Sequence, residues 1–106
     1  MSMDMNKMLQ QVQQMQEQMA KAQEELEHET VEASVGGGTV VVKANGSGEI
    51  TDIKIAPEAI DPDDPEGLAD LVLAGVNQAI RNVQELQQSK LGGAMGGLRG
   101  LGLPGL

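Results

Sequence analysis

Apolar side chains recur at a helical spacing near the N-terminus of the chain. Steps of three and four residues separate these positions, which are Met5, Met8, Val12, Met15, Met19, Ala22 and Leu26. This heptad pattern predicts a helix over 4–29, roughly 39 Å long at ~1.5 Å per residue. The stripe is narrower than the face with which a helix usually covers a sheet, so we expect part of this helix to project and pair with another helix. An ordinary core-facing stripe is the competing interpretation.

The next part of the chain has the composition and alternation of β-strands. Apolar and polar residues alternate over 30–35, and the segments 39–44 and 49–55 are rich in β-branched residues. Three glycines separate the first two segments, and "NGSG" joins the last two. An Asn-Gly pair accommodates the positive φ of a hairpin turn. The pattern therefore predicts a three-stranded antiparallel meander.

A second helix is predicted over 65–90, after an acidic loop rich in proline. Asp64 before Pro65 is a favourable helix start, with an acceptor at the N-cap and proline at the first helical position. Its broad apolar face should cover the sheet; that face consists of Leu68, Leu71, Val72, Gly75, Val76, Ala79, Ile80, Val83 and Leu86. Glycine within a helix costs roughly 1 kcal/mol relative to alanine, so Gly75 suggests a close backbone approach.

These elements predict an α+β fold with one domain over 1–90. The remaining segment, 91–106, contains seven glycines in sixteen residues, and we expect a flexible tail that does not hold a helix. The chain of 106 residues has no Phe, Tyr, Trp or Cys. Its core must therefore be aliphatic, and we expect a second subunit to complete it as a homodimer. No segment has the length of a membrane span or the features of a signal peptide, so the expected location is the cytoplasm.

Charge and composition restrict the possible partners. The formal net charge is −9, which argues against a nonspecific basic surface. Without aromatic rings the chain has no platform on which single-stranded bases could stack. A nucleic-acid partner would therefore be a duplex held through its backbone.

The sequence offers little for catalysis. His28 is the only histidine, and it stands among glutamates with no nucleophile placed beside it by a motif. Asp61, Asp63 and Asp64 do not form a calcium loop, since Pro65 occupies a ligand position and no glutamate closes the loop. No phosphate-binding or zinc-protease motif is present. We expect no enzymatic activity, metal, cofactor, small-molecule substrate or membrane partner.

The order of the pieces resembles the YbaB/EbfC family of nucleoid-associated proteins. The most specific stretches are "NGSGEITDIKI" before a proline-rich acidic loop, "LADLV" at 68–72 and "AGVNQA" at 74–79. The resemblance implies a homodimer with protruding helices that binds double-stranded DNA, changes its shape and acts in the nucleoid, in its organisation or in gene regulation. It also implies DNA contacts from the polar faces of the two helices, at Lys7, Gln10, Gln11, Gln14, Lys21, Arg81 and Lys90.

Two alternatives stay open at this point. The basic residues could be ordinary solvated charges, since Lys7 and Lys21 each have a carboxylate three or four residues away. We call Met5, Met8, Val12, Met15 and Met19 the methionine seam. In the family interpretation this seam packs within the dimer. In the alternative, the protein is a coiled-coil adaptor or chaperone-like module that offers the adaptable methionines to a protein partner.

Overall fold

The structure is a computed structural model that describes the backbone of residues 2–99 and the side chains of residues 4–92. Its elements in chain order are α1 (Ser2–His28), β1 (Thr30–Val35), a 3-10 turn (Gly36–Gly38), β2 (Val40–Asn45), β3 (Ile50–Ile55), a second 3-10 turn (Pro57–Ala59) and α2 (Pro65–Arg99). The strands form one antiparallel sheet in the order β1-β2-β3. The predicted α+β fold and meander are confirmed.

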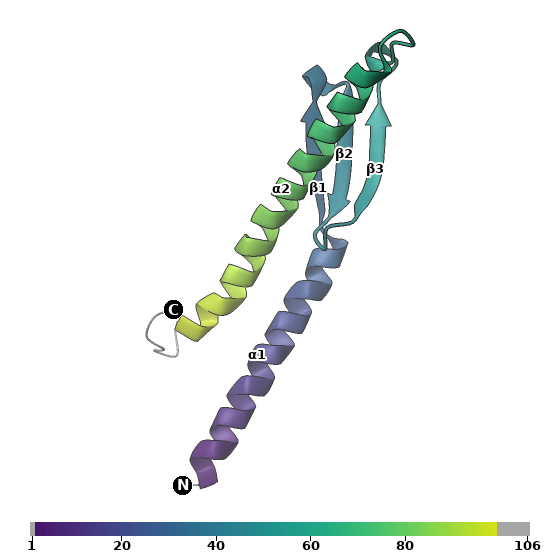
Figure 1. The fold of residues 1–106 in the computed structure, drawn as a ribbon. Coiled ribbons are helices and arrows are strands. Elements are labelled where there is room, and N and C mark those ends of the chain that lie inside the picture. The colour runs from purple at the N-terminus through teal and green to yellow at the C-terminus, as the bar shows by residue number, and fades with distance from the viewer. Residues whose placement is uncertain (1, 100–106) are drawn as a thin grey trace.

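Helix α2 lies across β1 and β2 and leaves β3 uncovered at one edge (Figure 1). The contact is made of small and branched aliphatic side chains, as the composition requires. The buried residues of this core are Ala33, Val40, Val42, Ala44, Ala79 and Val83. The core is therefore a single thin layer between one helix and two strands.

Gly75 lies where the helix comes closest to the sheet. A Cβ atom at this position would be 2.8 Å from Cγ2 of Val42 and 3.4 Å from Cγ2 of Val35. The first distance is shorter than real Cβ contacts and the second is at the lower limit of ordinary van der Waals contact, so a side chain at residue 75 would force Val42 to shift. The close approach predicted at Gly75 is confirmed.

The helix cap and the hairpin turn that the sequence predicts are both held by side-chain hydrogen bonds. The amide of Gly67 donates to Oδ1 of Asp64 at 3.0 Å, which caps the start of α2 as predicted. In the hairpin between β2 and β3, Oδ1 of Asn45 accepts from the amides of Ser47 (3.1 Å) and Glu49 (3.0 Å). The positive φ of this turn falls on Gly48, at 97°, and not on the Asn-Gly pair.

The predicted end of the second helix is wrong. Helix α2 continues past Lys90 to Arg99, through four of the glycines that were expected to prevent it. Extending an existing helix carries no nucleation cost, which offsets part of the propensity penalty of glycine. Leu91 is also half-buried beside Leu26 of α1. The rest of the expected tail, 100–106, lies outside the described residues.

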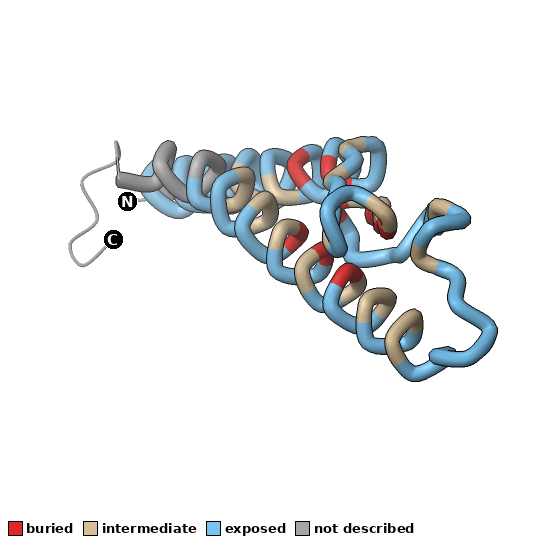
Figure 2. The backbone as a smooth tube through the Cα atoms, turned by 90° about the horizontal axis from the view of Figure 1, so that it is seen from above, coloured by how far each residue is buried: buried red, intermediate tan, exposed pale blue. Residues whose placement is uncertain are grey.

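Helix α1 projects from the body and gives the molecule its length, with principal extents of 75 × 24 × 17 Å (Figure 1). Only its C-terminal part is packed: Ala22 and Leu26 are buried, whereas residues 4–14 are all exposed (Figure 2). The prediction of a partly projecting helix is confirmed. Within residues 2–99, neither helix is long and apolar enough to cross a membrane.

The contact at Gly75 generates the first prediction. Gly75→Ala should lower the free energy of unfolding by about 1–2 kcal/mol, because overpacking strain exceeds the roughly 1 kcal/mol gained in helix propensity. Gly92→Ala is the matched control in the same helix, since a Cβ there meets no atom within 4 Å. It should raise stability by about 0.5–1 kcal/mol. Urea denaturation measures both, and a stabilised Gly75→Ala variant would contradict the packing described above.

Candidate nucleic-acid interface

The projecting part of α1, residues 4–21, is called the arm. Its regular helix places Lys7, Gln10, Gln14 and Lys21 on the side opposite the methionine seam, with Gln11 on the flank between the two. All five of these predicted contact residues are exposed. About 21 Å of helix separates the first lysine from the last. The structure thus brings these five residues together on one exposed surface.

The arm is electrically balanced. Its two lysines, Lys7 and Lys21, are equal in number to its two carboxylates, Asp4 and Glu17. The arm is therefore formally neutral, and the rest of the chain carries the whole formal charge of −9. Among the described residues, neither Lys7 nor Lys21 forms an ion pair. Both ammonium groups are therefore available to an anionic partner.

The other two predicted contact residues lie elsewhere. Arg81 is exposed on α2 over the body of the molecule, away from the arm. Lys90 lies at the base of the arm, where Nζ is 3.0 Å from Oε2 of Glu25 and 2.9 Å from Oε1 of Glu29. Its charge is already matched by two carboxylates. The structure therefore does not place Arg81 or Lys90 on the same surface as the arm residues.

The ionisation of this cluster follows from its hydrogen bonds. The hydrogen bond from Lys90, followed by its positive charge, lowers the pKa of Glu25. The hydrogen bonds to Glu29 and Glu25 raise the pKa of Lys90, and partial burial opposes them only in part. Both shifts favour the charged forms, so Glu25 and Lys90 stay ionised throughout the neutral pH range.

An apolar surface that sequence reasoning missed lies along the uncovered strand. Ile50, Ile53 and Ile55 stand opposite Ala44, Val42 and Val40 in the register, so they share the face of the sheet that α2 covers. They are nevertheless 37–39% exposed, because α2 does not reach them. The alternation in the strand sequences could have shown that these isoleucines share a face of the sheet. It could not have shown that α2 leaves this part of the face uncovered.

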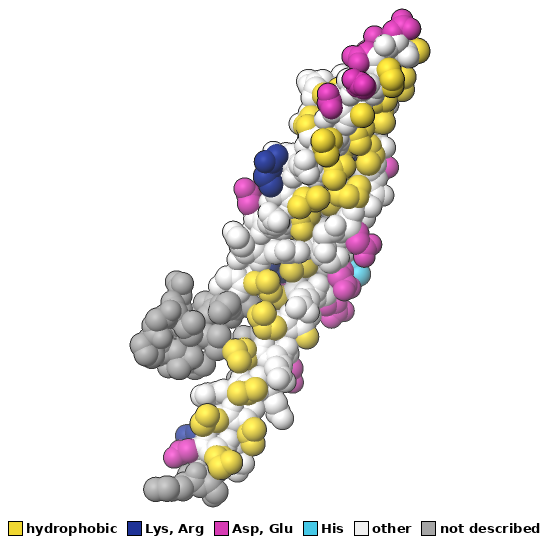
Figure 3. All heavy atoms as spheres, in the orientation of Figure 1, with side chains coloured by type: hydrophobic (Ala, Val, Ile, Leu, Met, Phe, Trp, Pro, Cys, Tyr) yellow, Lys and Arg dark blue, Asp and Glu magenta, His cyan; other side chains and the backbone are white. Residues whose placement is uncertain are grey.

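One flank of α2 continues this surface. Asn82 donates to the carbonyl of Glu32 in β1 at 3.0 Å, which fixes the flank that faces β1. Leu73 and Ile80 lie about half a helical turn from Asn82, on the flank toward β3, and they are 60% and 39% exposed. Figure 3 shows hydrophobic side chains gathered along this part of the molecule and continuing onto the arm. We call the surface of Ile50, Ile53, Ile55, Leu73, Val76 and Ile80 the β3–α2 face.

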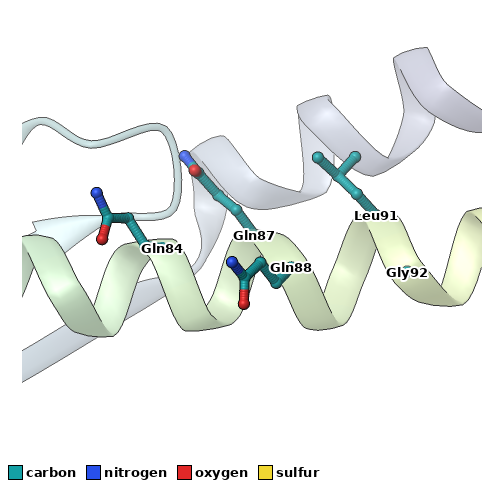
Figure 4. A pocket seen from close by; sticks show the side chains of 5 residues that line it. All are labelled: Gln84, Gln87, Gln88, Leu91 and Gly92. Carbon is teal, nitrogen blue, oxygen red and sulfur yellow. The ribbon is translucent and has the colours of Figure 1, made fainter.

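Two hollows lie near the base of the arm. The larger has a volume of about 670 Å³ and is lined by amide side chains and two further residues of α2: Gln84, Gln87, Gln88, Leu91 and Gly92 (Figure 4). The smaller, of about 330 Å³, lies between α1, α2 and the β2–β3 turn. In the described part of the chain, no group of three acidic or histidine side chains could hold a metal ion.

Comparisons with known proteins agree with the fold. Residues 1–98 match the model of the YbaB/EbfC DNA-binding family. A protein of Streptomyces avermitilis is 52% identical over 103 residues, covering 97% of this chain and 91% of that one. A protein of Ruminiclostridium cellulolyticum is 48% identical over 103 residues, covering 97% and 88%. Both are named nucleoid-associated proteins.

The crystal structure of the uncharacterized protein HP0035 from Helicobacter pylori has the same fold. It superimposes with a TM-score of 0.68 at 22% identity, covering 77% of this chain and 86% of that one. The family match extends over nearly the whole chain, from the arm through the sheet to the end of α2. The chain therefore belongs to the YbaB/EbfC DNA-binding family.

Proposed function

We propose that the protein binds double-stranded DNA as a homodimer, through the polar faces of its two arms, and changes the conformation of the duplex in the bacterial nucleoid. The observation that carries this proposal is the arm itself. It is a projecting helix of balanced charge, with a row of exposed amides and two lysines that form no ion pair within the described part of the chain, which is otherwise strongly acidic. Lysine and amide side chains bind phosphate oxygens without reading sequence.

The distribution of acidic residues gives DNA a direction of approach. Six exposed carboxylates stand at the end of the body farthest from the arm, in the loop before α2 and its first turns: Glu58, Asp61, Asp63, Asp64, Glu66 and Asp70. Figure 3 shows this acidic end opposite the tip of the arm. A duplex is repelled from the body end and meets its most favourable surface on the arm.

The β3–α2 face supports the homodimer. An apolar surface built from a sheet edge and a helix flank is costly to leave in water and is typical of an interaction site. A second copy seated there would cover β3 and supply the core volume that the missing aromatic residues do not. The methionine seam continues along the same side of the molecule, so the same partner can pack against it (Figure 3).

Two arms on one duplex explain a change in DNA conformation. A dimer grips the duplex at two points whose separation is fixed by the protein, so the DNA must bend or stiffen to satisfy both contacts. With no aromatic residue and few arginines, base-edge readout is poor, and preference comes from deformability. Roles in nucleoid organisation and gene regulation follow from such shaping.

A protein-interaction module is the second candidate. Its support is the exposure of Met5 (67%), Met8 (64%) and Val12 (42%) in the single chain. The two functions differ in what covers the methionine seam. Deuterium exchange of the isolated protein separates them, since a self-paired arm is protected and an arm that awaits another protein exchanges rapidly.

The dimer is tested at Leu73. Leu73→Glu places a charge on the β3–α2 face but leaves the core of the single chain intact, because this side chain is exposed. We expect a dimer for the parent protein and a folded monomer for the variant at micromolar concentration, measured by sedimentation velocity. Ala74→Glu adds the same charge at an exposed position on another side of α2 and should remain dimeric. A monomeric parent protein would overturn the proposal.

DNA binding is tested by its salt dependence. Four lysines from two arms should give a log–log salt slope of roughly −4. The double variant Lys7→Ala, Lys21→Ala should bind more weakly with a slope near zero, whereas Lys43→Ala, Lys54→Ala removes the same charge from the hairpin and should keep the parent slope. Fluorescence anisotropy on duplexes of different sequence and flexibility gives these values. Absence of binding at low salt would remove the DNA proposal and favour the interaction module.

A further inference from the structure

Within one chain, the direction of the arm is decided at a single small joint. Helix α1 ends at His28 and β1 begins at Thr30, so only Glu29 separates them. Toward the N-terminus from Ala22, no described residue of α1 is fully buried. The angle between the arm and the body therefore depends on the contacts made by the last two turns of α1.

Part of this joint is made by the backbone. The amide of Gly46 donates to the carbonyl of Glu29 at 3.0 Å, and the side chain of Gln87 donates to the carbonyl of Gly46 at 2.9 Å. A Cβ atom at residue 46 would overlap the carbonyl of Leu26, so Gly46 permits this contact. The end of α1, the β2–β3 turn and α2 thus meet at one point.

The other part is the ion cluster. Nζ of Lys90 on α2 lies 2.9–3.0 Å from carboxylates on both sides of the end of α1, Glu25 within the helix and Glu29 just after it. The second oxygen of Glu29 is buried and has no hydrogen-bond donor among the described residues. Glu29 therefore depends on Lys90 for compensation of its charge, and Lys90 holds α1 and α2 together.

We propose that Lys90 is a positioning residue for DNA binding: through Glu25 and Glu29 it fixes the angle of the arm, and it does not contact phosphate. This inference rests on the proposed function. About 27 Å of helix lies between Ala22 and Asp4, so a 10° change at the joint moves the tip of the arm by roughly 5 Å. That displacement exceeds the ~3.4 Å by which successive phosphates of one strand advance along the axis of the duplex, which is enough to misplace the arm lysines.

DNA-binding measurements distinguish a positioning role of Lys90 from a phosphate contact, because the two roles predict opposite changes in affinity for one variant. Glu25→Gln, Glu29→Gln removes two negative charges and releases Lys90, so a phosphate-contacting Lys90 would bind DNA more tightly. Positioning predicts weaker binding, by about tenfold, with the salt slope of the parent protein. Lys90→Met should have the same effect, and Lys90→Arg should restore binding. Glu24→Gln, Glu27→Gln, which removes the same charge from exposed neighbours outside the cluster, should not weaken binding.

A distance measurement without DNA tests the joint independently of the proposed function. The chain has no cysteine, so Gln13→Cys on the arm and Thr51→Cys on β3 provide the two sites for spin labels. Labelled chains diluted into unlabelled protein report the distance within one chain. The distribution should be narrow in the parent protein and in Glu24→Gln, Glu27→Gln, and broader or displaced in Lys90→Met and in Glu25→Gln, Glu29→Gln.

The outcomes separate the two proposals. Unchanged distances in both cluster variants, or tighter DNA binding by Glu25→Gln, Glu29→Gln, would overturn the positioning role. If the cluster variants show altered distances but the parent protein binds no DNA, the role of Lys90 in the joint is retained and the proposed function is removed. If the double variant does not fold, the single variant Glu25→Gln replaces it, since that side chain is 45% exposed and contributes less to folding.

Discussion

The packing of α2 on β1 and β2 through small side chains determines the arrangement of everything else. A chain without aromatic residues can fill only a thin layer, so the helix must lie almost directly on the strands, with Gly75 over Val42 and Val35. A helix held that closely covers two strands and not three. The exposed isoleucines of β3 follow from this geometry, as does the apolar flank of α2 beside them.

The length of α2 gives the same helix a second role. Beyond the sheet it continues past the base of α1. There Lys90 pairs with Glu25 and Glu29, Gln87 donates to the carbonyl of Gly46 in the β2–β3 turn, and Leu91 lines one hollow with Leu26. The packed core thereby supports an arm that has almost no core of its own. Most of the stability of a helix in a protein comes from packing of its apolar face, so the arm depends on this base, and on whatever covers its apolar stripe, for its order.

Charge is separated along the molecule in a way that net charge does not reveal. The arm is balanced and carries two lysines without ion pairs among the described residues, whereas the loop before α2 collects carboxylates at the far end. A protein of net charge −9 can then present a surface suited to an anionic polymer. Lys90 has a different role from the arm lysines, because its two carboxylate partners neutralise it within the fold.

The sequence by itself determined the features that depend on near neighbours. The heptad spacing in α1, the alternation in the strands and the cap at Asp64 could all be predicted, because periodicity and capping arise from residues a few positions apart. A glycine inside a helix also indicated the close approach at Gly75, although it did not identify Val42 and Val35 as the residues approached. Resemblance identified the family and suggested the polar face of the arm. The contribution of individual arm residues to DNA binding remains a prediction.

Only the tertiary structure decided which segments far apart in the sequence contact one another. Lys90 and Glu29 are 61 residues apart, and no local pattern pairs them. Gly46 carries the signature of a turn, yet its requirement comes from the carbonyl of Leu26 in another element. The continuation of α2 through its glycines and the open face of β3 likewise depend on where one helix lies on one sheet. That placement results from the sum of many weak apolar contacts across the whole chain, and no short stretch of sequence contains it.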